Sequence, residues 1–212
     1  DIPSSLKKAV TVTLTGEWDS DAFNLLSMAL GNNGGLFVTT NATLVTLDMS
    51  RIKVAENTPL WRQGLKEYGI FNNCTALEKV IMPTAEEAGH FTKLNKAFEG
   101  CTALRDIDLS LLTGATDIEA AFKGTAIEKA DLSGCTSLGS TVSAFEGCAA
   151  LQEVILPSCF VPANYTFADC TGLKLIDYTA YTDTEDAPAV KNNTFSGIDD
   201  LKLSLIHISE PT

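Results

Sequence analysis

One phrase recurs along the chain at nearly constant spacing, and this repetition constrains the fold more than any other feature. Two close copies are residues 96–110 (KAFEGCTALRDIDLS) and 143–157 (SAFEGCAALQEVILP). Each copy contains a phenylalanine, and the intervals between these are 27, 24, 23, 22 and 28 residues, in the series Phe71, Phe98, Phe122, Phe145, Phe167 and Phe195. Such a period is typical of solenoids, in which each repeat contacts only its neighbours.

Two segments of each copy have different predicted roles. The Leu-x-x-Val/Ile-x-Leu/Met segment, represented by Leu104, Ile107 and Leu109, predicts strands that stack in parallel about 4.8 Å apart. The Ala-Phe-x-Gly-Cys segment predicts the return turn, with Phe and Cys pointing inward. Glycine there supplies a backbone conformation that other residues avoid. We therefore expect the phenylalanines to stack as an aromatic spine.

The six cysteines follow the repeat. An even number is compatible with disulfides, but four of them stand three residues after a repeat phenylalanine: Cys74, Cys101, Cys148 and Cys170. This predicts an inward column of free thiols, because free Cys behaves as a small buried hydrophobe. Cys135 and Cys159 lie outside the column, and the sequence leaves open a disulfide that involves them. The spacings resemble no zinc site.

Residues 1–50 lack the Phe-x-x-Cys phrase of the repeats and predict an N-terminal cap of the solenoid. Residues 9–16 alternate as a half-buried strand does. Asp19 or Ser20 can then cap a helix with an apolar stripe of Ala22, Phe23, Leu26, Ala29 and Leu30, and Gly31 suits its C-terminal cap. Residues 44–50 have the shape of a repeat strand. A terminal unit of this kind covers the open end of a solenoid core.

Residues 51–202 are expected to form the repeats, in a single domain with the cap. Residues 51–70 are an insertion in this pattern, and its Trp61 is either an anchor onto the repeats or a ligand-stacking aromatic. Residues 203–212 (LSLIHISEPT) resemble the translation of a transposase-type sequencing adapter. We treat them as a non-native tail and expect the natural chain to continue past Lys202 with further repeats or domains.

Composition narrows the classes of function. The chain is 45% hydrophobic and 20% charged, as ordered globular proteins are. A net charge of -12 argues against a nucleic-acid partner, because phosphates would be repelled. No apolar run approaches the roughly 20 residues that a membrane-spanning helix needs.

If the strands align, their exposed side chains form columns across the repeats. These columns supply the candidate ligand-binding face: Asp48, Lys79, Ile81, Asp106, Asp108, Lys129, Asp131, Glu153, Ile155 and Asp177. The acids can attract a basic or hydroxyl-rich ligand, or a hard cation through oxygen ligands. The alternative is a solvated strand face whose charges prevent aggregation.

The phrase FEGCTALRDIDLS at residues 98–110 resembles the BspA-type leucine-rich repeat, and the resemblance covers about residues 44–202. It implies an α/β leucine-rich-repeat solenoid with a parallel sheet on one face and short helices or turns on the other. It also implies an extracellular or cell-surface location in bacteria and an adhesive or recognition role. The departures from the pattern are the copy at Phe122, which lacks the cysteine, and the insertion at residues 51–70.

Catalysis finds little support in the sequence. His90 is the only histidine before residue 203, and it lies in a loop that we expect to be away from any cluster at a strand end. Asp106 and Asp108 could serve as a glycosidase pair, but they are expected on an open face. No phosphate loop, HExxH or G-x-S-x-G motif is present. We expect no enzyme activity, no cofactor and no metal.

The sequence therefore favours a non-catalytic extracellular recognition or adhesion module that binds a protein or glycan on its exposed sheet face. A first alternative is a structural spacer that holds a missing C-terminal domain away from the cell. A remote alternative is a fragment of a glycan-active enzyme.

Overall fold

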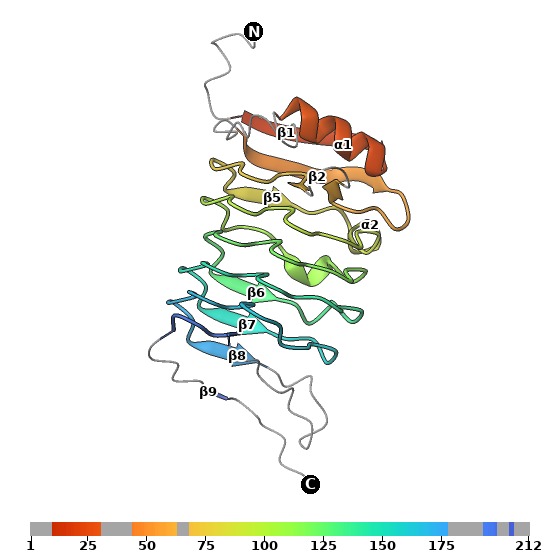
Figure 1. Ribbon diagram of the computed structural model, residues 1–212. Helices are drawn as coiled ribbons and strands as arrows, with labels where there is room; N and C mark the ends of the chain where they lie inside the picture. Colours follow the sequence, from red (N-terminus) through yellow and green to blue (C-terminus); the bar gives the residue numbers. More distant parts are fainter. Residues whose placement is uncertain (1–9, 31–43, 63–67, 178–192, 199–203, 206–212) are drawn as a thin grey trace.

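A computed structural model describes residues 10–30, 44–62, 68–177, 193–198 and 204–205. Successive turns of the chain stack on one another from the N-terminal cap to β8 (Figure 1). The elements in chain order are β1 Val10–Trp18, α1 Ser20–Ala29, β2 Leu44–Val54, β3 Trp61–Arg62, β4 Tyr68–Gly69, β5 Lys79–Ile81, α2 Ala85–Ala88, a 3₁₀ helix Leu109–Leu111, β6 Lys129–Asp131, β7 Glu153–Ile155, β8 Leu175–Asp177 and β9 Ser204–Leu205.

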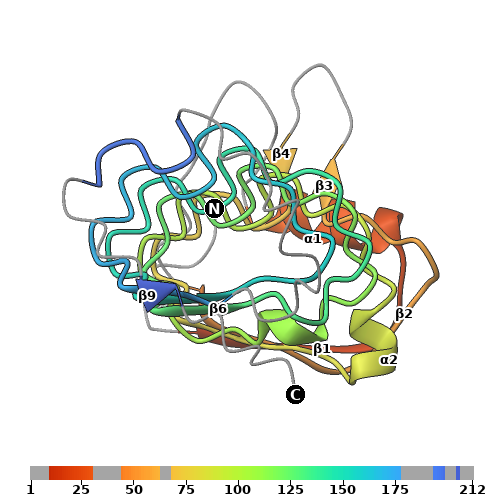
Figure 2. The same cartoon turned by 90° about the horizontal axis from the view of Figure 1, so that it is seen from below.

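The repeat strands pair in parallel, as predicted. One sheet has the order β1-β2-β5 and a second has the order β6-β7-β8-β9, while β3 and β4 form a small antiparallel pair. Viewed along the stack, the strands of the two parallel sheets lie on one side, and the connecting turns lie on the other together with β3 and β4 (Figure 2). The register matches the predicted columns, for example Ile81 opposite Asp48 and Glu153 opposite Lys129.

The copy at residues 96–110 departs from the predicted strand. Its Asp106 forms an isolated parallel bridge with Lys79, and among the described residues no ladder joins it to β6. The prediction of a regular strand is wrong here, because the chain enters the 3₁₀ helix at Leu109, with Asp108 as its N-cap.

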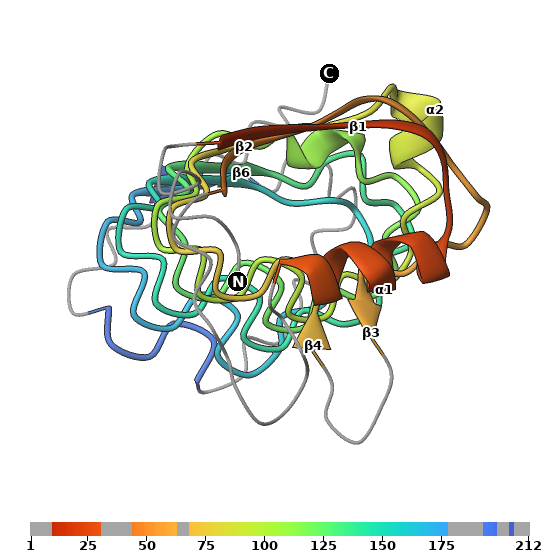
Figure 3. The same ribbon diagram turned by 90° about the horizontal axis from the view of Figure 1, so that it is seen from above.

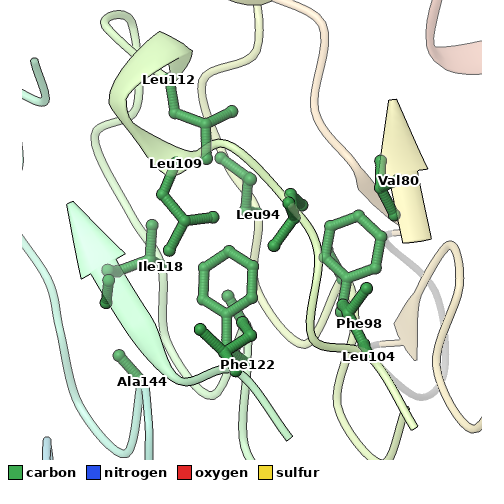
Figure 4. Close-up of a cluster of buried hydrophobic side chains, with 14 of the residues drawn as sticks. Val80, Leu94, Phe98, Leu104, Leu109, Leu112, Ile118, Phe122 and Ala144 are labelled. Carbon is green, nitrogen blue, oxygen red and sulfur yellow. The ribbon is translucent and has the colours of Figure 1, made fainter. Parts of the chain in front are cut away.

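The interior contains the residues that alternate with the exposed columns. At most 9% of the surface of each is accessible in the set Leu47, Val80, Ile107, Ala130, Val154 and Ile176. Figure 4 shows Phe98 and Phe122 surrounded by aliphatic side chains from neighbouring turns, including Leu94, Leu104 and Ile118. The core therefore continues through the interruption of the sheet.

The predicted aromatic spine is confirmed. From Phe71 to Phe195, successive rings have centroid distances of 5.3 to 5.8 Å and interplanar angles of 11° to 14°. These separations lie within the range of favourable aromatic pairs. A translational repeat brings the same ring to the same place in each turn.

The predicted column of free thiols is also confirmed. Cys101 Sγ donates a hydrogen bond to the carbonyl oxygen of Phe71 at 3.1 Å. Cys148 and Cys170 make the same bond to the phenylalanine of the preceding repeat, at 3.0 Å each. Cys135 and Cys159 are free as well, and Cys159 Sγ donates to the Cys135 carbonyl oxygen at 3.2 Å.

Left-handed backbone recurs at two positions of the turns, the first in six described turns and the second in four. Two residues after the phenylalanine, φ lies between 57° and 78° at Asn73, Gly100, Gly124, Gly147, Asp169 and Gly197. Two residues before it, φ lies between 50° and 60° at Lys96, Ala120, Ser143 and Tyr165. The first set consists of residue types that tolerate this conformation, and the second does not.

The cap consists of β1, α1 and β2. Asp19 is the N-cap, and its Oδ1 accepts from the Ala22 N–H at 2.9 Å. The helix ends at Ala29 with Leu30 as its C-cap, and Gly31, which was predicted to suit the C-terminal cap, lies outside the described residues. In Figure 3, α1 lies across from β1 and β2, where the repeats have their turns.

The helix stripe is partly corrected. Phe23 is buried, and Leu26 and Leu30 pack against the core, but Ala29 is exposed and Ser27 is buried in its place. These four inward positions share one face of a helix with 3.6 residues per turn.

The structure adds two observations at the ends of the repeats, one on the boundary of the cap and one on the tail that begins at residue 203. Strand β2 continues to Val54, beyond the predicted end of the cap at residue 50. The excluded tail contributes β9, whose Ser204 pairs in parallel with Leu175 of β8. An exposed strand edge offers unpaired backbone groups to any extended segment, so this pairing needs no repeat motif.

Candidate functional site

All ten predicted face residues are at least partly exposed, and the parallel register arranges them in two groups. The first group lies on β2, β5 and the segment of the isolated bridge: Asp48, Lys79, Ile81, Asp106 and Asp108. The second lies on β6, β7 and β8: Lys129, Asp131, Glu153, Ile155 and Asp177. Together they present six carboxylates, two lysines and two isoleucines.

Each group contains an ion pair across neighbouring turns. Lys79 Nζ lies 2.6 Å from Asp106 Oδ2, and Lys129 Nζ lies 2.8 Å from Glu153 Oε1. The hydrogen bond to Glu153, with help from the charges of Glu153, Asp131 and Asp177, raises the pKa of Lys129. Exposed pairs of this kind contribute little to stability, so their main effect is to fix the charge pattern.

Asp108 and Asp131, which lie two residues beyond the ion-paired positions 106 and 129, have a second role that was not predicted from the sequence. Asp108 Oδ1 accepts from the Ser110 N–H at 3.1 Å and from its hydroxyl at 2.6 Å. Asp131 Oδ1 accepts in the same way from Ser133, at 3.0 and 2.6 Å. These are side-chain turns that Asp favours, and the recurring Asp-Leu-Ser phrase was the signal for them.

The cap and the isoleucines obey the same rule. Asp48 Oδ1 accepts from the Ser50 N–H at 2.9 Å, and the hydrogen bonds from Ser50 lower the pKa of Asp48. Ile81 and Ile155 are followed two residues later by Pro83 and Pro157. Proline has no N–H that needs an acceptor, so this column can be apolar there. Turn chemistry thus accounts for part of the variation along the face.

The glycosidase reading of Asp106 and Asp108 loses support from this geometry. Asp106 is ion-paired with Lys79, and Asp108 holds the turn at Ser110. A retaining or inverting pair needs one carboxyl group kept protonated as the acid. Among the described residues, no group of three His, Cys, Asp or Glu side chains is arranged to hold a metal ion.

Four buried thiols, those of Cys101, Cys135, Cys148 and Cys170, do not offer an exposed nucleophile. Burial raises the pKa of Cys101, Cys148 and Cys170, and it raises the pKa of Cys135 to about 12. The thiolate is the reactive form of cysteine, so burial disfavours the reactive form of these four residues.

His90 corrects the sequence prediction, because it lies at the end of a strand and not away from one. Its Nδ1 is 2.7 Å from the carbonyl oxygen of Val54, the last residue of β2. Glu87 Oε2 accepts from the Val54 N–H at 2.5 Å and lies 3.9 Å from the His90 ring nitrogen. No local sequence signal connects residue 90 with residue 54; the contact depends on stacking.

Comparison with known proteins identifies one family. The BspA type leucine-rich repeat region matches residues 67–202 in six copies. No curated protein and no solved structure matches the chain. In the part of the chain that the structure describes, no helix is long and apolar enough to cross a membrane.

Proposed function

Because this chain belongs to the BspA-type leucine-rich repeat family, we propose that it is a non-catalytic recognition module of a secreted or cell-surface bacterial protein. Its repeats form a solenoid, and the partner is a protein or a glycan that binds the exposed sheet face. Members of such repeat families bind partners through extended surfaces.

The observation that carries this proposal is the face of ten accessible side chains on in-register parallel turns. The register holds their backbone positions without help from a ligand, so the surface is preorganised. Its charge is negative, with six carboxylates against Lys79 and Lys129. A partner rich in basic or hydroxyl donor groups complements it.

The test removes charge from this face while keeping the turns intact. In the double variant Asp108→Asn and Asp131→Asn, each amide oxygen can still accept the hydrogen bond from the following serine. We expect affinity for a ligand identified on glycan and protein arrays to fall at least about tenfold, since each charge-assisted contact is worth more than a neutral one.

The matched control is Asp21→Asn with Glu56→Gln, which removes the same charge from exposed positions outside the face. Its affinity should equal that of the wild type, and both double variants should melt near the wild-type temperature. Equal affinity of the face variant and the control would refute this placement of the site.

A further inference from the structure

A hollow of about 550 Å³ lies at the edge of the cap, and none of the ten face residues lines it. Its lining residues come from the end of β1, the start of α1, the end of β2, and α2 with the residues that follow it; Figure 3 shows where these elements lie in the ribbon. Its polar and aromatic lining comprises Glu17, Trp18, Asp19, Lys53, Glu87 and His90. Pockets of about 300 to 1,000 Å³ are the usual size for small-molecule sites.

The hydrogen bonds of this lining determine which groups remain for a ligand. His90 Nδ1 is bonded to the Val54 carbonyl oxygen at 2.7 Å. A carbonyl oxygen only accepts, so Nδ1 carries the proton. In the neutral ring, Nε2 is then a hydrogen-bond acceptor. Glu87 accepts from the Val54 N–H, and its carboxylate adds acceptor capacity to the same wall.

Trp18 offers its ring and not its N–H. Its Nε1 donates to the Thr15 carbonyl oxygen at 3.0 Å. Phe23 lies 5.0 Å from it, centroid to centroid, at an interplanar angle of 51°, and fixes the indole in place. What Trp18 supplies to the hollow is therefore a rigid aromatic surface, which attracts cations.

The lining contains more acidic than basic side chains. It has three carboxylates, those of Glu17, Asp19 and Glu87, and one lysine, Lys53, so its formal charge is negative when His90 is neutral. Asp19 Oδ1 already accepts from the Ala22 N–H, but a carboxylate has about four acceptor positions. Lys53 is the only charged donor. The hollow thus needs a ligand that brings donors and positive charge.

We propose that this hollow binds a guanidinium group, that of an arginine side chain on a protein partner. Guanidinium is planar, carries five N–H donors, pairs with carboxylates through two parallel bonds and stacks on aromatic faces. Ammonium is a compact and strongly hydrated point charge, so it uses the indole surface less well. A neutral sugar gains nothing from the net charge.

The experiment uses the full chain with Trp61→Phe, which leaves Trp18 as the single tryptophan. Its fluorescence is titrated with acetyl-Gly-Arg-Gly-amide, free L-arginine, acetyl-Gly-Lys-Gly-amide and methyl glucoside. We expect a saturable change with the arginine peptide, at least about fivefold tighter than with the lysine peptide. Tighter binding of the peptide than of free arginine identifies a protein as the source of the group.

Two variants locate the site. Glu17→Gln with Asp19→Asn should weaken arginine binding at least about fivefold, while Asn still serves as the helix N-cap. Lys53→Met should strengthen it. The sheet-face variant Asp108→Asn with Asp131→Asn should leave it unchanged, so failure here is distinguishable from failure of the proposed function.

Three results would overturn the proposal. The first is an absence of saturable change with any arginine compound. The second is equal binding of the lysine peptide or of methyl glucoside. The third is unaltered arginine affinity in the Glu17→Gln, Asp19→Asn variant.

Discussion

The cap and the repeats bury the same kind of interior by different means. The repeat strands β5 to β8 have three residues each, whereas β1 and β2 have nine and eleven. In the repeats the aromatic rings stack nearly parallel. In the cap, Phe23 meets Phe71 at 85° and Phe91 at 67°. Phe23 therefore packs edge-on against Phe71, the first ring of the stacked series, and ends the stack on the side of the cap.

The difference shows how a repeating structure terminates. An inner repeat takes hydrogen bonds and ring contacts from both neighbours, so a short strand suffices. The cap has a repeat neighbour on one side only. It compensates with long paired strands, a helix in place of a turn, and side chains that satisfy the end of β2 at Val54. Terminal units of solenoids are atypical for this reason.

The largest effect is expected when one phenylalanine ring is removed from the repeats or from the cap. Phe122→Ala should destabilise the protein by about 3 to 5 kcal/mol, the usual cost of deleting a buried phenylalanine, because the rings on both sides prevent collapse of the cavity. Phe23→Ala should cost a similar amount. Denaturant unfolding measures both.

Hydrogen exchange separates the two variants. Phe23→Ala should speed exchange in β1, α1 and β2 and leave β7 and β8 protected, since repeats contact only their neighbours. Phe122→Ala should affect the repeats on both sides of it. Equal loss of protection throughout the chain in the Phe23 variant would mean that cap and repeats form one cooperative unit.

An intermediate effect is expected at glycines with left-handed backbone. Gly100 has φ 73°, and a Cβ there would lie 2.3 Å from Asn73 Oδ1 of the preceding turn. Gly16 in the cap has φ 88° and nothing within 4 Å of a Cβ. Gly16→Ala should therefore show only the backbone cost of about 1 to 2 kcal/mol.

Gly100→Ala should cost about 1 kcal/mol more, because Asn73 must move and give up its hydrogen bond to Asn72. Thermal or chemical denaturation of the two variants gives the difference. Equal losses would show that the turns of neighbouring repeats are not closely packed, against the contact at Gly100.

The smallest effect concerns the side chains that end β2. Glu87→Ala leaves the Val54 N–H without its acceptor and should destabilise the protein by about 1 to 2 kcal/mol. Glu87→Gln retains an acceptor and should cost about half as much. Faster exchange of the Val54 amide proton is the local readout. If Glu87→Ala left the free energy of unfolding unchanged, water would have to replace the carboxylate as the acceptor.

Much of the fold could be predicted from sequence because repetition exposes which positions must be alike. Phe98 and Cys101 recur at fixed spacing, and both are buried in their columns. The left-handed position two residues after Phe can also be recognised from the sequence, since Gly, Asn and Asp tolerate positive φ. The second left-handed position, at Lys96 and Ala120, cannot be recognised in this way, because those residue types give no local signal of positive φ.

The candidate face was predicted as a set of positions, and its chemistry was not. Period-two alternation identifies Asp108 and Asp131 as outward, yet their bonds to Ser110 and Ser133 and the pairing of Lys79 with Asp106 need coordinates. The contact of His90 with Val54 spans 36 residues. It joins a loop to a strand end that no motif connects.

The sequence by itself determined the repeating unit, the inward Phe and Cys columns and the parallel register, and it predicted a terminal cap. These follow from periodicity, since equal spacing places equal residues at equal sites. Only the tertiary structure decided how the cap ends the spine, which acids hold turns, and where Glu17, Trp18 and His90 meet. Such contacts join segments far apart in the chain, and their geometry depends on stacking that local sequence does not encode.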